Sequence, residues 1–331
     1  MNNNELSAVI EQLSEFQIEQ IRKMAESFLN LNEELSNTKP TNCPCCKSVT
    51  ARFIKKGFSG RKQRYQCKEC GKKFTYDIGK FTSFSQQSDE RWAIFIEDTF
   101  NLQTLDYCAK HLDVCHATAF NMRQKLMGFL EDAMKQTPIL DGMIEADETY
   151  VQNGKKGICV SDRKPRKHGE SATKRGLSRE QVCICVAADR DGNMIATCVN
   201  SGKPSAENIK NAIGNKIADG AVFQCDGEKA YNKMIEEKNC TKVILHSHED
   251  YNKVYHLNTV NGLHSRLKDL LKHFRGVSTK YLNRYLAMFT AMQMAARSEK
   301  QDISDFIRSL LFDVYDFLPI RCLMTERLLT V

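Results

Sequence analysis

Residues 144–150 read IEADETY, in which apolar and polar side chains alternate as they do along a β-strand. Side chains two positions apart share one face of a strand, so Glu145 and Asp147 lie on one face and Glu148 on the other. A buried strand rarely carries charge unless the charge is used. The stretch therefore predicts a core strand that supports a polar site.

A second apolar strand, residues 221–225, ends at Asp226 and Gly227. Two aspartates on strands of one sheet can bind divalent cations of the Mg²⁺ type, which prefer carboxylate oxygens. Two such ions about 3.5–4 Å apart can activate an attacking oxygen and stabilise the leaving oxygen in phosphodiester chemistry. The alternative for either aspartate alone is a strand-end residue that caps a turn.

The surrounding pattern predicts an α/β fold with a mixed sheet, because strands and helices alternate along the chain. Strands are expected at 143–151, 181–190, 194–200, 221–225 and 242–246, and helices at 205–219, 228–238 and 257–274. Residues 277–331 are expected to be helical.

The N-terminal part divides differently. Residues 5–35 predict a helix with one apolar stripe, and residues 88–135 predict three helices. The segments 104–111 and 117–126 have the dimensions of a helix-turn-helix, in which Arg123 and Lys125 would reach DNA. The alternative is a plain helical bundle.

Cys43, Cys46, Cys67 and Cys70 form two CxxC pairs separated by 20 residues. Four thiolates at this spacing predict a tetrahedral Zn²⁺ site without an open position, so the zinc is expected to be structural. So short a segment needs the metal in order to fold.

Charge is strongly segregated along the chain. The net charge is +7, yet residues 1–36 hold seven acids and two bases, whereas residues 39–80 hold twelve bases and two acids. Residues 154–179 hold nine bases and two acids, within a basic insert at 152–180. Such patches indicate a polyanionic partner, most simply DNA. The basic side chains expected at DNA are Arg61, Arg64, Arg123, Lys125, Lys164, Arg166, Lys167, Arg266, Lys272 and Arg275.

The cellular compartment of the protein is inferred from two features that the sequence lacks. The polar, acidic N-terminus lacks the layout of a signal peptide, and no apolar run reaches 18 residues. A cytoplasmic protein without a membrane partner is therefore expected, in which most of the 14 cysteines stay reduced.

Four ordered blocks resemble one known family, the zinc-ribbon-bearing insertion-sequence transposases of the ISXO-like (IS-fifteen-ninety-five) type, in the DDE superfamily. The blocks are residues 144–150, 225–231, 256–268 and 274–286. The resemblance implies an RNase H-like catalytic core that uses Mg²⁺ or Mn²⁺, with Asp147 and Asp226 as the first and second ligands. It also implies transposon-end and target DNA as partners and a homo-oligomer on DNA.

The third ligand position departs from the usual pattern of that family. Related enzymes usually carry Glu there, whereas this chain has Asn261, with 34 residues between it and Asp226. Asparagine can ligate through its carbonyl oxygen but is neutral. Asn258, Glu249 and Asp250 are weaker candidates. Lys268 lies two helical turns further on and is expected to hold a phosphate. His256 and His264 could bind phosphate or complete the core.

The predicted organisation has five parts: a helix at 1–37, a zinc ribbon at 38–82, a helical region at 83–138, a catalytic core at 139–290 and a helical segment at 291–331. The predicted reaction is cleavage at transposon ends followed by strand transfer into target DNA. Two alternatives stay open, a non-catalytic or decayed transposase that regulates through DNA binding, and a related nuclease that cuts without joining.

Overall fold

The computed structural model describes residues 40, 43–46, 48, 50–59, 62–75, 85–134, 139–154, 176–274 and 276–297. The predicted helix at 5–35, most of the basic insert and residues 298–331 lie outside this range. The chain divides into two compact units, with the boundary between Phe84 and Ser85. The helical region predicted at 83–138 therefore belongs almost entirely to the same unit as the core predicted at 139–290.

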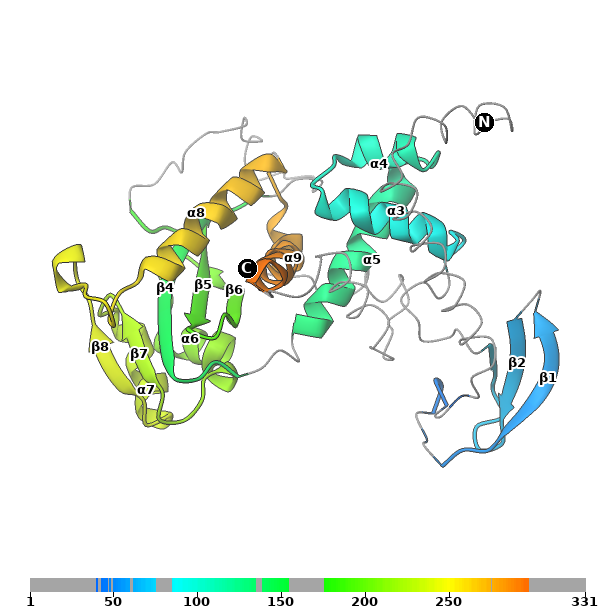
Figure 1. The fold of residues 1–331 in the computed structure, drawn as a ribbon, viewed down its shortest axis with the longest axis horizontal. Helices are drawn as coiled ribbons and strands as arrows, with labels where there is room; N and C mark the ends of the chain where they lie inside the picture. Colours follow the sequence, from blue (N-terminus) through cyan, green and yellow to red (C-terminus); the bar gives the residue numbers. More distant parts are fainter. Residues whose placement is uncertain are drawn as a thin grey trace, which may run out of the picture. The chain divides into compact units, whose positions relative to one another are not determined.

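The first unit holds a three-stranded antiparallel sheet in the order β1-β2-β3 (Figure 1). Its strands are β1 (Phe53–Ser59), β2 (Lys62–Cys67) and β3 (Lys73–Thr75). Tyr65 and Phe74 pair across β2 and β3 and are buried together with Cys43 and Cys67. Among the described residues of this unit the apolar cluster is small, so a bound metal would add much of the stability of the sheet.

The second unit is built on a five-stranded mixed sheet in the order β6-β5-β4-β7-β8. The strands are β4 (Met143–Gln152), β5 (Gln181–Asp189), β6 (Met194–Ser201), β7 (Val222–Cys225) and β8 (Thr241–Ile244). β4, β5 and β6 pair antiparallel, whereas β4, β7 and β8 pair parallel. The predicted α/β fold with a mixed sheet is confirmed.

Helices cover both faces of this sheet (Figure 1). On one face, α6 (Ala206–Ile213) and α7 (Asn232–Glu237) bury apolar side chains against β4, β5 and β7. On the other face, α8 (Asn258–His273) and α9 (Leu282–Arg297) pack on β5 and β6. The predicted helix at 205–219 is shorter than expected, since a 3₁₀ turn (Gly214–Lys216) follows α6.

Three helices precede the sheet, as predicted: α3 (Asp89–Phe100), α4 (Leu105–His111) and α5 (His116–Met134). Ser88 and Thr104 cap α3 and α4, because their side chains accept hydrogen bonds from backbone N–H groups in the first turn. α5 packs against α9. Residues 122–130 of α5 are buried on every side, so α5 is an interior helix for most of its length.

Within the described residues, no helix is both long enough and apolar enough to cross a membrane.

Candidate functional site

Asp147 lies in β4 on the face that α8 covers. Its Oδ1 accepts a hydrogen bond of 2.9 Å from the Glu148 backbone, and its Oδ2 lies 3.7 Å from His264 Nδ1. Burial raises the pKa of Asp147 to about 6; the charge of Asp226 acts in the same direction and that of Lys268 in the opposite one. Two of the other predicted site residues, Asp226 and Lys268, therefore act electrostatically on Asp147.

Asp226 follows β7 directly and is exposed. Its Oδ1 accepts a 3.0 Å hydrogen bond from the Glu228 backbone. β4 and β7 are parallel neighbours with Glu145 opposite Gln224, so continuing this register by two residues brings Asp147 level with Asp226. Gly227 lets the chain turn here: its φ is +94°, and a Cβ would lie 2.9 Å from the His246 ring.

α8 carries the remaining predicted site residues and packs on the same face of the sheet as Asp147. Asn261 and Lys268 are exposed, and the side chain of Asn261 hydrogen-bonds with Tyr251. His264 lies between them on the helix and is buried. Burial, aided by the charge of Lys268, lowers the pKa of His264 to about 4, so the imidazole is neutral at physiological pH.

Glu148 is a further carboxylate near the site, on the opposite face of β4 as the strand alternation predicted. Burial raises its pKa to about 7; a hydrogen bond with Tyr231 opposes this, and the charges of Asp147 and Asp226 add to it. Its Oε1 is buried and has no hydrogen-bond partner among the described residues. A third acidic group therefore lies near the two predicted aspartates, and its burial favours the protonated form.

The four predicted zinc ligands converge in the first unit. All four Sγ atoms lie within 4.8 Å of one another, with Cys43 Sγ 3.7 Å from Cys70 Sγ and Cys46 Sγ 3.8 Å from Cys67 Sγ. A Zn–S bond of about 2.3 Å gives a tetrahedron with edges of about 3.8 Å, so the sulfur positions fit zinc. Cys45 is exposed and outside the group.

The predicted DNA-contacting residues fall into three groups. Arg64, Arg266 and Lys272 are exposed. Arg123 and Lys125 are only 2% and 1% exposed, because α5 is enclosed by neighbouring helices. The prediction that these two side chains contact DNA is therefore corrected, since neither faces solvent in this structure. Arg123 donates a hydrogen bond to the Gln103 carbonyl oxygen at 2.7 Å, and burial lowers the pKa of Lys125 to about 8. The remainder, Arg61, Lys164, Arg166, Lys167 and Arg275, lie outside the described residues.

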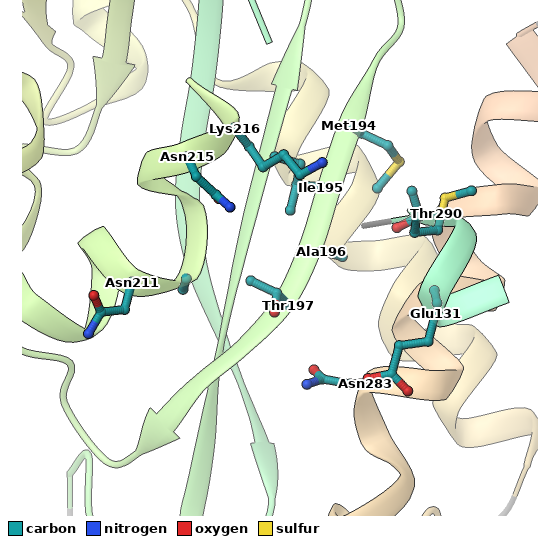
Figure 2. Close-up of a pocket in the computed structure, with 13 residues that line it drawn as sticks. Glu131, Met194, Ile195, Ala196, Thr197, Asn211, Asn215, Lys216, Asn283 and Thr290 are labelled. Atoms are coloured by element: carbon teal, nitrogen blue, oxygen red, sulfur yellow. The ribbon is translucent and has the colours of Figure 1, made fainter. Parts of the chain in front are cut away.

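A cavity of about 230 Å³ lies elsewhere, at the β6 edge of the sheet (Figure 2). Thr197 of β6, Asn211 of α6 and Asn283 of α9 line it, together with Glu131 of α5. None of the carboxylates near α8 reaches it. The cavity is therefore separate from the candidate metal site, which lies at the inner strands β4 and β7.

Comparison with known proteins identifies the second unit. Residues 139–291 match the family model of the ISXO2-like transposase domain. The chain carries an ISXO2-like transposase domain. The match spans β4 to α9 and includes all four residues predicted to be catalytic, Asp147, Asp226, Asn261 and Lys268.

This transposase is also similar to a curated protein of Halobacterium salinarum, described as an uncharacterized protein in transposable element ISH50. The two are 28% identical over 251 residues, which cover 75% of this chain and 83% of the relative. Together with the family-model match, this similarity confirms the predicted resemblance to the insertion-sequence transposases.

Solved structures of the Mos1 transposase are more distant. A pre-cleavage Mos1 transpososome shares 16% identity with a TM-score of 0.29, over 67% of this chain and 73% of the other. The catalytic domain of Mos1 mariner transposase shares 14% identity with a TM-score of 0.25, over 57% of this chain and 84% of the other.

Glu145, Gln224, Arg190 and Tyr251 were not predicted as site residues. Glu145 and Gln224 each precede an aspartate by two positions, so strand alternation was the available signal for both. Arg190 and Tyr251 carry no such signal, because each comes near the site through a loop.

Proposed function

We propose that this transposase cuts DNA at transposon ends and joins the freed 3′-hydroxyl to target DNA, in a centre formed by Asp147, Asp226, Asn261 and Lys268. The observation that carries the proposal is the register of Glu145 with Gln224 on the parallel strands β4 and β7. Continued by two residues, it brings Asp147 level with Asp226, and α8 packs on this face of the sheet. The sheet supports an RNase H-like core, since β5 alone runs against the other four strands.

Asp147, Asp226 and the carbonyl oxygen of Asn261 would hold Mg²⁺ or Mn²⁺, which supply activation of the attacking oxygen and stabilisation of the leaving one. The residues fit such ions, because burial and, to a lesser extent, the charge of Asp226 raise the pKa of Asp147, and a bound cation would offset both effects. Asn261 adds an oxygen without charge.

The other side chains prepare the substrate. Lys268 is exposed and acts electrostatically on Asp147, which suits contact with a phosphate next to the reacting one. His264 stays neutral next to Asp147 and competes little with metal for the carboxylate.

The four-cysteine group would hold a structural zinc ion, with Arg64 at the DNA backbone. Two ends are joined in one reaction, so a homo-oligomer assembled on DNA is part of the proposal.

The test is a strand-transfer assay on terminal-repeat DNA with Mg²⁺ or Mn²⁺, comparing Asp226→Asn with Asp219→Asn. Asp219 is an exposed acid that pairs with Lys238, away from the site. We expect Asp226→Asn to abolish cleavage and joining, and Asp219→Asn to react like wild type. Equal activity of wild type and Asp226→Asn would refute the catalytic role. If the wild-type protein cleaves DNA without joining it, the protein is a nuclease. If it binds DNA without cleaving it, the protein is a DNA-binding regulator.

A further inference from the structure

We propose that Glu145 and Gln224 are positioning residues that hold the first turn of α8 against the two aspartates and so place Asn261 and Lys268. The inference rests on the proposed function for its consequence, but its structural part stands on contacts of this chain alone.

Glu145 caps α8 from another element. Its side chain is 1% exposed, and its Oε2 accepts hydrogen bonds from the backbone N–H groups of Thr259 at 2.9 Å and Val260 at 3.2 Å. Its Oε1 accepts from the Thr259 hydroxyl at 2.8 Å. The first N–H groups of a helix have no partner within the helix, and a carboxylate there also meets the positive end of the helix dipole.

Gln224 holds the residue that leads into the helix. It is fully buried in β7, and its Oε1 accepts a 3.0 Å hydrogen bond from the His256 backbone. Glu145 and Gln224 are register partners across β4 and β7. One pair of side chains in the sheet therefore fixes residues 256–260, immediately before Asn261.

Arg190 completes the contact from the loop between β5 and β6. It forms an ion pair with Glu145, and it donates a 3.1 Å hydrogen bond to the Val254 carbonyl oxygen. His256 Nδ1 lies 3.2 Å from Glu145 Oε1 and its Nε2 lies 3.2 Å from Arg190. The buried carboxylate thus has a counter-charge, and the approach to α8 is tied to the sheet at several points.

The arrangement ties the geometry of the candidate metal site to one strand pair. Strand alternation places Glu145 and Asp147 on the same face, and likewise Gln224 and Asp226. The pair that holds α8 is thus adjacent to the pair that would hold metal. If the first turn of α8 loosens, Asn261 no longer keeps a set distance from both aspartates, although none of the proposed ligands has changed.

The experiment compares Glu145→Ala with Ser205→Ala in the full chain. Ser205 caps α6, its Oγ accepting from the Asn208 backbone at 3.3 Å, and α6 carries no proposed ligand. Both variants lose a helix cap. Amide hydrogen exchange is measured without metal, Mn²⁺ affinity by electron paramagnetic resonance, and cleavage as a function of Mn²⁺ concentration.

For Glu145→Ala we expect faster exchange at residues 259–261, Mn²⁺ affinity about tenfold or more weaker, and cleavage partly restored by higher Mn²⁺. Ser205→Ala should speed exchange only in α6 and leave Mn²⁺ affinity unchanged. Glu145→Gln, which keeps one acceptor oxygen, should lie between Glu145→Ala and wild type and serves if the alanine variant fails to fold.

Unchanged exchange at residues 259–261 in both Glu145 variants would overturn the proposal, as would an equal loss of Mn²⁺ affinity in Ser205→Ala. If wild type neither binds Mn²⁺ nor cleaves DNA, the proposed function fails. The exchange comparison would still decide whether Glu145 holds α8.

Discussion

Asp147 shows how one buried carboxylate can favour metal binding and disfavour the metal-free fold. Its pKa lies near 6 instead of 3.8, chiefly because burial disfavours the charged form. Between these two pH values the folded protein binds more protons than the unfolded chain. The contribution of Asp147 to stability is therefore lost as pH rises from about 4 to about 6.

Asp147→Asn should therefore stabilise the metal-free protein near neutral pH, by about 1–3 kcal/mol, while it abolishes cleavage. The gain should shrink as pH falls through about 6 towards 4, where the wild-type carboxyl group becomes protonated. Urea unfolding at several pH values without divalent ions measures this. Asp219→Asn is the control; if it shows the same pH-dependent gain, the effect does not come from burial of Asp147.

Asn261 is the residue on which the proposed third ligand depends. Asn261→Ala removes the carbonyl oxygen and should lower the cleavage rate at limiting Mg²⁺ by about tenfold or more, with DNA affinity unchanged. Asn258→Ala changes an exposed asparagine in the first turn of the same helix and should have little effect. A larger loss in Asn258→Ala would move the ligand to that residue.

At the scale of elements, α5 departs from what its sequence indicated, whereas α8 does not. Both carry basic side chains at helical spacing, yet α8 leaves Arg266 and Lys272 exposed, whereas α5 buries Arg123 and Lys125. The cause is packing, because α8 lies on the sheet with one face free, whereas α5 is enclosed along residues 122–130. Only the exposed basic side chains can contact DNA phosphates without unfolding part of the protein.

The salt dependence of DNA binding should distinguish these helices. Arg266→Ala and Lys272→Ala should each reduce the slope of log K against log salt by about one, because each phosphate contact releases about one counterion. Lys125→Met should leave the slope unchanged. Fluorescence anisotropy over a salt series gives these slopes; a reduced slope in Lys125→Met would place that side chain at DNA after all.

At the scale of the whole molecule, the two units depend on different forces. The sheet of the second unit is covered by apolar clusters on both faces, whereas the described part of the first unit has one small apolar cluster around four cysteines. The stability of the first unit should therefore depend on bound metal, whereas that of the second unit should depend on it little.

Removal of zinc with a chelator should unfold β1–β3 and weaken DNA binding, while fluorescence of Trp92, the one tryptophan of the chain, stays unchanged. Trp92 is buried in the second unit and reports on that unit alone. Cys67→Ser should mimic the chelator, and Cys45→Ser should retain one zinc ion per chain. Loss of zinc in Cys45→Ser would contradict the proposed ligand set.

The amino-acid sequence by itself determined what depends on local spacing. Two CxxC pairs predicted a four-cysteine group, and alternation in IEADETY predicted a strand with Asp147 on the face of Glu145. Periodicity within each segment predicted strands and helices, because it reflects which face is buried. The order of these strands and helices along the chain then predicted the mixed sheet.

Only the tertiary structure decided which distant residues meet. The partners of Glu145 lie more than a hundred positions away in α8, and Gln224 joins them through the register of β4 with β7. Burial of Arg123 and Lys125 likewise depends on helices that fold around α5. Such contacts follow from strand register and helix packing, which bring together residues that no local pattern in the chain relates.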